Sequence, residues 1–330
     1  MADPNPTSGV HHVTCIAGDP QRNMDFWVET LGLRLVKRSI NQDDPETHHF
    51  FFADAAGTPG TSITFFPWEG MSQGKVGTGQ VSRTAFRVPA GSLDYWEERF
   101  DEYGVDYDDR VERFGETVLP FRDPDGLPVE LVEVAIPDDD PTEPWTEFVP
   151  EEAAIRGFHS VTLWLADPQP TGELLRTMGL EEVGTEQAQG DTPGDERTRF
   201  AATGEVGKYV DVLPTIEGGR QGHGTVHHVA FRTPTDEDQA GMRKAIRLEG
   251  LSPTKQIDRH WFRSVYVREH GGVLFELATS GPGYTSDEPL DGLGGRLVLP
   301  GEFEDRREDI EAQLTDVTVP RAETAEASGD

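Results

Sequence analysis

The stretch Gly9-Val10-His11-His12-Val13-Thr14 returns later in the chain as Gly157-Phe158-His159-Ser160-Val161-Thr162. Each copy is followed by an Asp-Pro pair, a stretch with helical spacing and a Gly-Leu pair. A second pair of stretches, Thr84–Pro89 and Val229–Pro234, shares the run Ala-Phe-Arg. Repetition of this kind indicates a chain built from copies of one supersecondary unit. The sequence therefore predicts two similar halves, each holding two related units.

Each unit is predicted to contain one strand, one helix and three further strands. β-Rich stretches such as His12–Ile16 and His228–Phe231 open the units. Helical periodicity follows, as at Arg22–Leu31 and Glu237–Glu249, and then β-rich runs return. A Gly-containing turn such as Pro124-Asp125-Gly126 joins the last two strands. The predicted fold class is α+β, with four βαβββ modules that form two open-barrel sheets.

Domain boundaries follow from the repeat and from an acidic, Pro-rich stretch after residue 136. Residues 8–136 are predicted to hold modules 1 and 2, 137–153 a linker, 154–281 modules 3 and 4, and 282–330 a C-terminal extension. Within the extension we expect one amphipathic helix, Glu302–Leu314, and a disordered acidic tail, Ala322–Asp330. A second candidate loop is Gln187–Glu196.

Composition excludes several classes of function. The 330 residues include 61 acidic and 29 basic side chains, a formal net charge of -32, which disfavours binding to nucleic acid or an anionic membrane. No apolar run approaches the roughly 18 residues of a membrane span, and the N-terminus lacks the pattern of a secretory signal. The single cysteine, Cys15, excludes an internal disulfide framework. We expect a cytoplasmic protein whose oligomeric state the sequence leaves open.

The excess of acidic residues predicts salt-dependent stability. Self-repulsion at a net charge of -32 destabilises a compact state at low salt. Molar salt shrinks the Debye length to about 3 Å and removes most of that repulsion. We therefore hypothesise a halophile's protein whose melting temperature rises with KCl concentration. Thermal melts in a KCl series measure this, and equal stability at low and multimolar salt would contradict it.

The histidine pairs are the strongest candidates for a functional site. The second position of each module's opening pair reads His12, Arg83, Ser160 and His228 in modules 1 to 4. Only modules 1 and 4 together offer two imidazoles there. The last strands of modules 2 and 4 carry Glu130 and Glu276. Because Phe275 and Leu277 should face a core, Glu276 should face the other side of its strand, where a bare charge is costly.

These residues predict a metal centre formed by His12, His228 and Glu276. Two imidazoles and one carboxylate make a facial triad that leaves positions open for small molecules. Such a set suits Fe(II) and oxygen chemistry, and it can also hold Mn(II) or Zn(II). Modules 1 and 4 must then lie side by side around the ion.

Other polar residues in the modules are predicted not to bind the metal. Arg83 is expected to form an ion pair with Glu130 in a copy of the site that has lost its ligands. His159 matches His11, the first member of its pair, so we expect no metal ligation there. His48-His49 precedes a run of three phenylalanines, and one of the two is expected to face the pocket without acting as a ligand. Neighbouring strand residues point to opposite faces, so one member of each pair should face a given concave side.

In this combination of features the chain resembles the vicinal oxygen chelate superfamily, and within it the ring-cleaving dioxygenases of the hydroquinone-dioxygenase type. The resemblance covers about residues 9–315. It is carried by His11–Thr14, Phe52–Asp54, Gly57–Thr61, Arg156–Ser160, His227–Phe231, Tyr266–Arg268 and Gly271–Glu276.

The resemblance implies two glyoxalase-like sheets and an Fe(II) cofactor held by His12, His228 and Glu276. It also implies a hydroquinone- or catechol-type aromatic substrate into which both atoms of O₂ are inserted. Further site residues implied by the resemblance are His11, Thr14, His227, Arg259 and Tyr266. Of these, His227 is the candidate proton shuttle, and Tyr266 with Arg259 would hold substrate oxygens.

Two alternatives stay open. The first is a glyoxalase-type metal-dependent lyase of the same fold, whose sites usually carry two glutamates. The second is a non-catalytic protein that binds aromatic compounds or drugs, although such proteins tend to lose the metal ligands. Trp261 and Phe262 are candidates for the apolar walls in each case.

Overall fold

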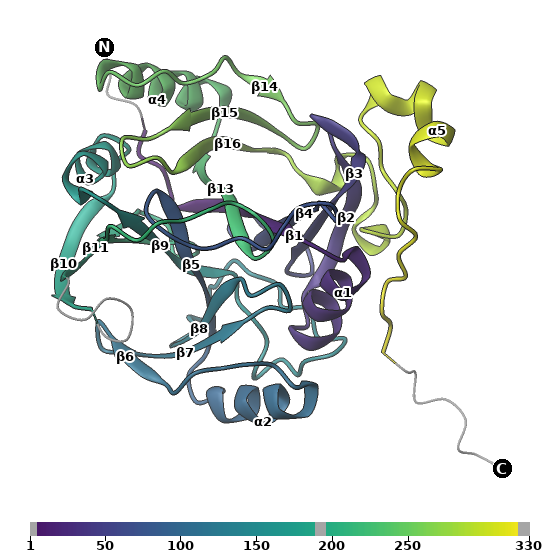
Figure 1. The fold of residues 1–330 in the computed structure, drawn as a ribbon, viewed down its shortest axis with the longest axis horizontal. Coiled ribbons are helices and arrows are strands. Elements are labelled where there is room, and N and C mark those ends of the chain that lie inside the picture. Colours follow the sequence, from purple (N-terminus) through teal and green to yellow (C-terminus); the bar gives the residue numbers. More distant parts are fainter. Residues whose placement is uncertain (1–4, 189–195, 323–330) are drawn as a thin grey trace.

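The computed structural model describes residues 5–188 and 196–322, and it confirms four βαβββ modules (Figure 1). Module 1 comprises β1 (Val10–Ala17), α1 (Pro20–Asp25) with the π-helical turn η1 (Phe26–Thr30), β2 (Arg34–Asn41), β3 (Asp44–Ala53) and β4 (Ser62–Pro67). Module 2 comprises β5 (Gln80–Pro89), α2 (Leu93–Tyr103), β6 (Val111–Arg113), β7 (Glu116–Arg122) and β8 (Pro128–Val134). Module 3 comprises β9 (Phe158–Leu165), α3 (Pro168–Thr177), β10 (Glu181–Gln187), β11 (Glu196–Ala201) and β12 (Tyr209–Pro214). Module 4 comprises β13 (Thr225–Thr233), α4 (Asp236–Leu248), β14 (Ile257–Asp258), β15 (Phe262–Arg268) and β16 (Leu274–Pro282).

The strands form two curled eight-stranded sheets. One has the order β14-β15-β16-β13-β1-β4-β3-β2, and the other has the order β10-β11-β12-β9-β5-β8-β7-β6. Module 1 therefore lies beside module 4, as predicted, and module 2 lies beside module 3. Each sheet takes one module from each half of the sequence. The boundaries 8–136 and 154–281 thus describe the repeat, and they remain a proposal for a division into domains.

The repeated Asp-Pro pairs begin the helices. The Asp19 carboxylate accepts a hydrogen bond from the Arg22 backbone N–H at 2.8 Å, and Pro20 occupies the first turn of α1. Asp167 caps α3 through the Gln169 N–H at 3.1 Å, again with a proline behind it. A capping carboxylate satisfies a free N–H, and proline loses nothing at a position whose N–H has no helical partner.

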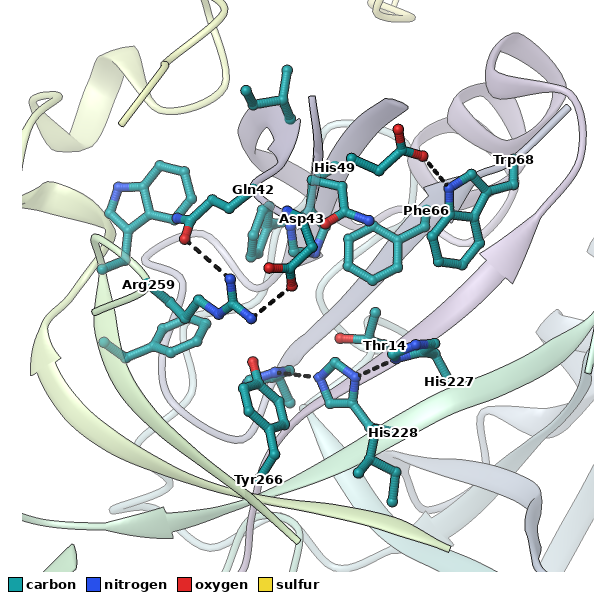
Figure 2. Close-up of a pocket in the computed structure, with 18 residues that line it drawn as sticks. Thr14, Gln42, Asp43, His49, Phe66, Trp68, His227, His228, Arg259 and Tyr266 are labelled. Carbon is teal, nitrogen blue, oxygen red and sulfur yellow. Dashed lines mark hydrogen bonds and ion pairs between the residues drawn. The ribbon is translucent and has the colours of Figure 1, made fainter. Parts of the chain in front are cut away.

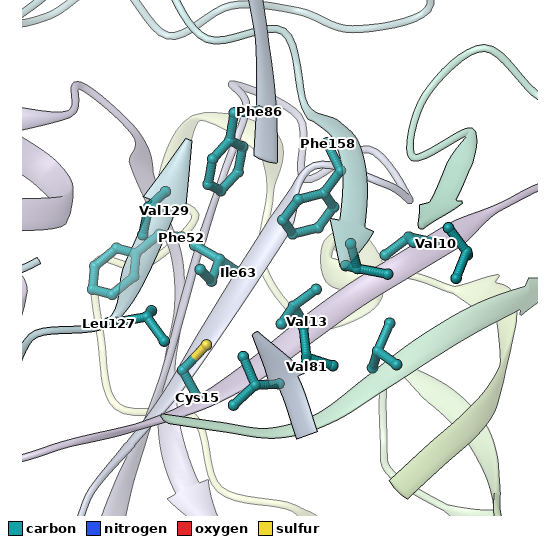
Figure 3. Close-up of a cluster of buried hydrophobic side chains, with 14 of the residues drawn as sticks. Val10, Val13, Cys15, Phe52, Ile63, Val81, Phe86, Leu127, Val129 and Phe158 are labelled. Atoms are coloured by element: carbon teal, nitrogen blue, oxygen red, sulfur yellow. The ribbon is translucent and has the colours of Figure 1, made fainter. Parts of the chain in front are cut away.

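Because side chains alternate along each strand, each sheet has one face in the hydrophobic core and one concave face, which is called its cup below. In β1, Val13 and Cys15 lie in the main hydrophobic core between the sheets, together with Phe86 and Phe158 of the other sheet (Figure 3). His12 and Thr14 project to the opposite, concave side, where they line a cavity. Since the two faces of a strand alternate residue by residue, burial of Val13 and Cys15 in the core places His12 on the concave side.

The C-terminal extension runs along the outer side of module 1 (Figure 1). The predicted helix Glu302–Leu314 is wrong as a single element, because a 3₁₀ segment at Gly301–Arg306 leads into a short helix, α5, at Arg307–Glu311. Only Ile310 of this stretch is fully buried, so little apolar burial supports a longer helix. The tail expected to be disordered lies almost wholly outside the described residues, as does most of the loop Gln187–Glu196. Among the described residues no helix is long and apolar enough to cross a membrane.

Candidate metal centre

A β-bulge occurs at the first member of each module's opening pair. Between β1 and β13 the register skips His11 and His227, and between β5 and β9 it skips Ser82 and His159. A bulge inserts one unpaired residue and re-aims its side chain. The expectation that neighbouring histidines face opposite sides is therefore wrong at these positions. The rings of each His-His pair touch instead, with centroids 5.1 Å apart.

Three candidate ligand atoms meet on the floor of the module 1–module 4 cup. The two Nε2 atoms of His12 and His228 lie 3.3 Å apart. Glu276 Oε2 lies 3.3 Å from His12 Nε2 and 2.9 Å from His228 Nε2. Ligands about 2.1 Å from one ion lie about 3.0 Å apart at right angles. The three atoms are thus spaced as ligands that share an ion. This is the one such group of three found among the described histidine, cysteine and acidic residues.

The surroundings of Glu276 fit a metal ligand. Its Oε1 accepts a hydrogen bond from Ser264 Oγ at 2.5 Å, whereas Oε2 is buried and faces the Nε2 atoms of the two imidazoles. Burial alone would raise the pKa of this carboxyl, but the imidazoles of His12 and His228 outweigh it and hold the pKa well below its ordinary value. A fully buried carboxylate is costly unless a cation neutralises its charge. The donor set therefore suits a divalent ion.

The first histidine of each pair supports the second. His11 Nδ1 lies 2.9 Å from His12 Nδ1, and His227 Nδ1 lies 2.8 Å from His228 Nδ1. Burial, with the neighbouring histidine, lowers the pKa of His227 to about 3 and that of His11 well below its ordinary value. Both rings are therefore neutral at neutral pH. Each can accept one hydrogen bond from its neighbour, which fixes the orientation of that neighbour.

His12 and His228 line a cavity of about 350 Å³, and Figure 2 shows the side chains around it. Its walls are largely aromatic, as expected for Trp261 and Phe262, and a polar rim comes from the turn between β2 and β3. Residues that line it include His12, Thr14, Asn41, Gln42, Asp43, His49, Phe51, Phe66, Trp68, His227, His228, Arg259, Trp261, Phe262 and Tyr266. A concave, mostly apolar site with a few polar groups is typical of a small-molecule site.

The remaining predicted residues, Thr14, Tyr266 and Arg259, all line this cavity. The Tyr266 ring lies edge-on to His228, with centroids 5.7 Å apart, and burial followed by the charge of Glu276 raises the pKa of its hydroxyl. Arg259 lies over the Tyr266 ring at 5.4 Å and donates to Asp43 Oδ2 at 2.8 Å. All eight predicted site residues are thus at or beside one centre. Their catalytic roles stay predictions.

The C-terminal extension fixes part of the cavity wall. Asp287 accepts hydrogen bonds from Trp261 Nε1 at 2.9 Å and from His260 Nε2 at 2.8 Å. The same carboxylate, with Glu288, also pairs with the fully buried ammonium of Lys37. Trp261 is therefore held by a segment that has no counterpart in the repeat.

His49 is the site residue that the sequence left unassigned. It lines the cavity, whereas His48 points away and bonds to the Thr315 carbonyl at 2.8 Å. The alternation along β3 gives the reason. Phe50 and Phe52 lie in the core between the sheets, so Phe51 and His49 lie on the cup side. The three phenylalanines hid this alternation in the sequence.

The module 2–module 3 cup holds an ionic cluster at the matching place. Glu130 Oε1 lies 3.1 Å from Arg83 Nε, as predicted, and Oε2 accepts from Arg113 Nη1 at 2.6 Å. His159 Nδ1 lies 3.1 Å from Ser160 Oγ, which repeats the contact of the His-His pairs, and its Nε2 faces Glu116. The bulges and the carboxylate thus remain in this cup, while the Arg83 guanidinium and the Ser160 hydroxyl stand where the other cup has imidazoles.

The amino-acid sequence is similar to those of known proteins with this fold. Residues 9–131 match the family described as Glyoxalase/Bleomycin resistance protein/Dioxygenase superfamily. The chain is 44% identical to "Putative ring-cleaving dioxygenase MhqO" of Bacillus subtilis (strain 168), over 93% of this chain and 96% of that protein. It is 33% identical to "Chlorohydroquinone/hydroquinone 1,2-dioxygenase" of Sphingobium indicum, over 97% of this chain and 99% of that protein.

Solved structures give the same fold. The crystal structure of a Bacillus subtilis protein described as a putative dioxygenase superposes with a TM-score of 0.89 at 42% identity, covering 96% of this chain and 99% of that chain. Glyoxalase I from Zea mays superposes with a TM-score of 0.59 at 15% identity, covering 82% of this chain and 92% of that chain. At that identity the second likeness supports the fold alone.

Proposed function

Since the chain belongs to the glyoxalase/bleomycin resistance protein/dioxygenase superfamily, we propose that it is a metal-dependent dioxygenase that cleaves the ring of hydroquinone- or catechol-type aromatics. One observation carries the proposal. His12 Nε2, His228 Nε2 and Glu276 Oε2 converge on the floor of an aromatic-lined cavity large enough for one substituted ring. The ion would be Fe(II), with Mn(II) as the alternative.

His12, His228 and Glu276 would hold the metal. When bound, a redox-active divalent ion supplies the coupling between dioxygen and an aromatic diol that neither reactant provides alone. Ligation through Nε2 leaves the proton of each ligand imidazole on Nδ1. That N–H then donates to Nδ1 of the preceding histidine, at the 2.8 and 2.9 Å distances of the two pairs.

This hydrogen bonding separates the roles of His11 and His227. A neutral ring that accepts at Nδ1 carries its own proton on Nε2. His11 is not among the residues that line the cavity and packs against Phe262, with centroids 5.2 Å apart, so its ring serves to hold His12. His227 lines the cavity, so its Nε2–H can donate a hydrogen bond to a substrate oxygen. We therefore propose His227 as the residue that donates a hydrogen bond to a substrate oxygen, and its predicted role as a proton shuttle stays a prediction.

Tyr266 and Arg259 complete the polar side of the cavity. The raised pKa of the Tyr266 hydroxyl keeps it protonated, so it can donate a hydrogen bond to a substrate oxygen. Arg259 is held in place by Asp43 and by stacking on Tyr266, and its positive charge would stabilise an oxyanion formed during cleavage. Thr14 lies two residues after His12 on the same face of β1 and adds a hydroxyl beside the ligands.

Oxygen consumption tests the proposal. Protein loaded with Fe(II) under anaerobic conditions is expected to consume one O₂ per hydroquinone or catechol turned over, with both oxygen atoms recovered in a ring-opened product. An oxygen electrode and mass spectrometry of the product after reaction in labelled O₂ measure this. Protein loaded with Zn(II) is the control and should consume none. No uptake with any dihydroxylated aromatic would overturn the proposal in favour of a lyase or a binding protein.

A further inference from the structure

His49 stands on the cavity wall with one ring nitrogen already engaged. Its Nε2 lies 3.0 Å from Thr64 Oγ1, and Thr64 Oγ1 lies 2.8 Å from Thr14 Oγ1. The His49 ring packs against Phe51 and Phe66, with centroid distances of 3.9 and 4.4 Å. The two threonines and the two aromatic rings hold the imidazole in one orientation.

The other ring nitrogen, Nδ1, has no hydrogen-bond partner among the residues that the structure describes. His49 lines the cavity, on the wall across from His228 and Tyr266 (Figure 2). Burial, with the nearby imidazoles of His12 and His228, holds the pKa of His49 well below its ordinary value, so the ring is neutral. A neutral imidazole has one donor and one acceptor nitrogen, and each needs a partner when water is excluded.

His49 stands on a part of the cavity wall that is otherwise apolar. Its neighbours Phe51, Phe66 and Trp68 already form an apolar surface that suits an aromatic ring. Para-related oxygens lie at opposite ends of a ring. A dihydroxylated ring with one oxygen at the metal centre therefore presents its second hydroxyl away from the three ligands.

We propose that His49 recognises the second hydroxyl of a para-dihydroxylated ring and thereby makes the cavity selective for hydroquinones over monohydroxylated phenols. The inference rests on the proposed function for the position of the first oxygen. A hydroxyl both donates and accepts, so it pairs with either tautomer of His49. The contact to Thr64 holds the imidazole on the cavity wall and leaves Nδ1 for that hydroxyl. A site built to bond a hydroxyl discriminates strongly against an analogue that lacks it, because its own polar group is then left unpaired.

Binding of hydroquinone and phenol tests the inference without turnover. Trp68 and Trp261 line the cavity, so ligand binding can be followed by quenching of their fluorescence in protein loaded with redox-inert Zn(II). The readout is the ratio of the two dissociation constants. His49→Leu is expected to lower the preference for hydroquinone by about tenfold or more, from the loss of one buried hydrogen bond. His49→Gln, which keeps an amide at the wall, should restore part of the preference.

His48→Gln is the matched control, because His48 is on the same strand but bonds to the C-terminal extension outside the cavity. It should leave the ratio unchanged. An unchanged ratio in His49→Leu, an equal fall in the control, or no preference in the wild type would each overturn the inference. Because each ratio is measured within one variant, lower stability of a variant cannot imitate the effect.

Oxygen uptake by the Fe(II)-loaded wild type separates the two proposals. Uptake together with an unchanged ratio in His49→Leu would overturn the role of His49 alone. A lost preference without uptake on any dihydroxylated ring would overturn the dioxygenase proposal and leave His49 as a recognition residue.

Discussion

Replacing Glu276 with Gln is expected to abolish metal binding and to lower turnover by about a thousandfold or more, since a metal ion contributes several kcal/mol to the transition state. The amide keeps the size of the side chain and the hydrogen bond from Ser264 to Oε1. It removes the anionic Oε2 that faces both imidazoles at 2.9 and 3.3 Å. Because the centre then carries no negative charge, a divalent ion is held by two neutral nitrogens only.

Metal content by elemental analysis and turnover by oxygen uptake measure this result. A third readout is the rise in melting temperature on adding metal, which follows from binding to the folded state and should vanish in Glu276→Gln. His228→Ala should give the same loss from the histidine side. Full metal content with normal turnover in either variant would contradict the assignment of the centre.

The ligands could be predicted because the four modules can be aligned, so that the residues at one matching position can be compared. His12 and His228 stand where module 2 has Arg83 and module 3 has Ser160, so only one combination of modules supplies two imidazoles. The alternation around Glu276 could also be read from the sequence, and the structure confirms Phe275 and Leu277 in the core. Binary patterning fixes which face of a strand is buried, and that was enough to orient these three side chains.

The bulges at His11 and His227 could not be predicted in the same way. A bulge is a property of the register between two strands, and β1 pairs with β13, which lies about 200 residues later in the sequence. The sequence alone offers regular alternation, which wrongly separates the two rings of each pair. The position of His49 in the cavity could not be predicted for a related reason. Adjacent aromatic residues on both faces of β3 conceal the two-residue alternation of the strand. The support of Trp261 by Asp287 lies outside the repeat altogether.

The corresponding substitution in the module 2–module 3 cup, Glu130→Gln, should lower the free energy of unfolding without changing the metal content. Glu130 is buried at 1% exposure between Arg83 and Arg113, whose guanidiniums lie 3.1 and 2.6 Å from its two oxygens. Removing one partner of a buried pair leaves an uncompensated charge. We expect a loss of about 3 kcal/mol in the free energy of unfolding at neutral pH, near the lower end for buried pairs. The lower end applies because Arg83 retains 17% exposure.

The pH dependence of this loss identifies its cause. Burial would raise the pKa of Glu130, but Arg113 and Arg83 outweigh it and the pKa is lowered below its ordinary 4.5. A carboxyl with a lowered pKa stabilises the fold above its unfolded-state value, and that stability is lost as the pH falls through the folded-state value. Denaturant unfolding should therefore show the full difference between wild type and Glu130→Gln near pH 7 and a shrinking difference below pH 4.5. Metal content should stay at the wild-type level throughout the neutral range, because the two carboxylates serve separate cups. Loss of metal in Glu130→Gln at neutral pH, or a stability difference that does not change with pH, would contradict this division between an ionic cluster and a metal centre.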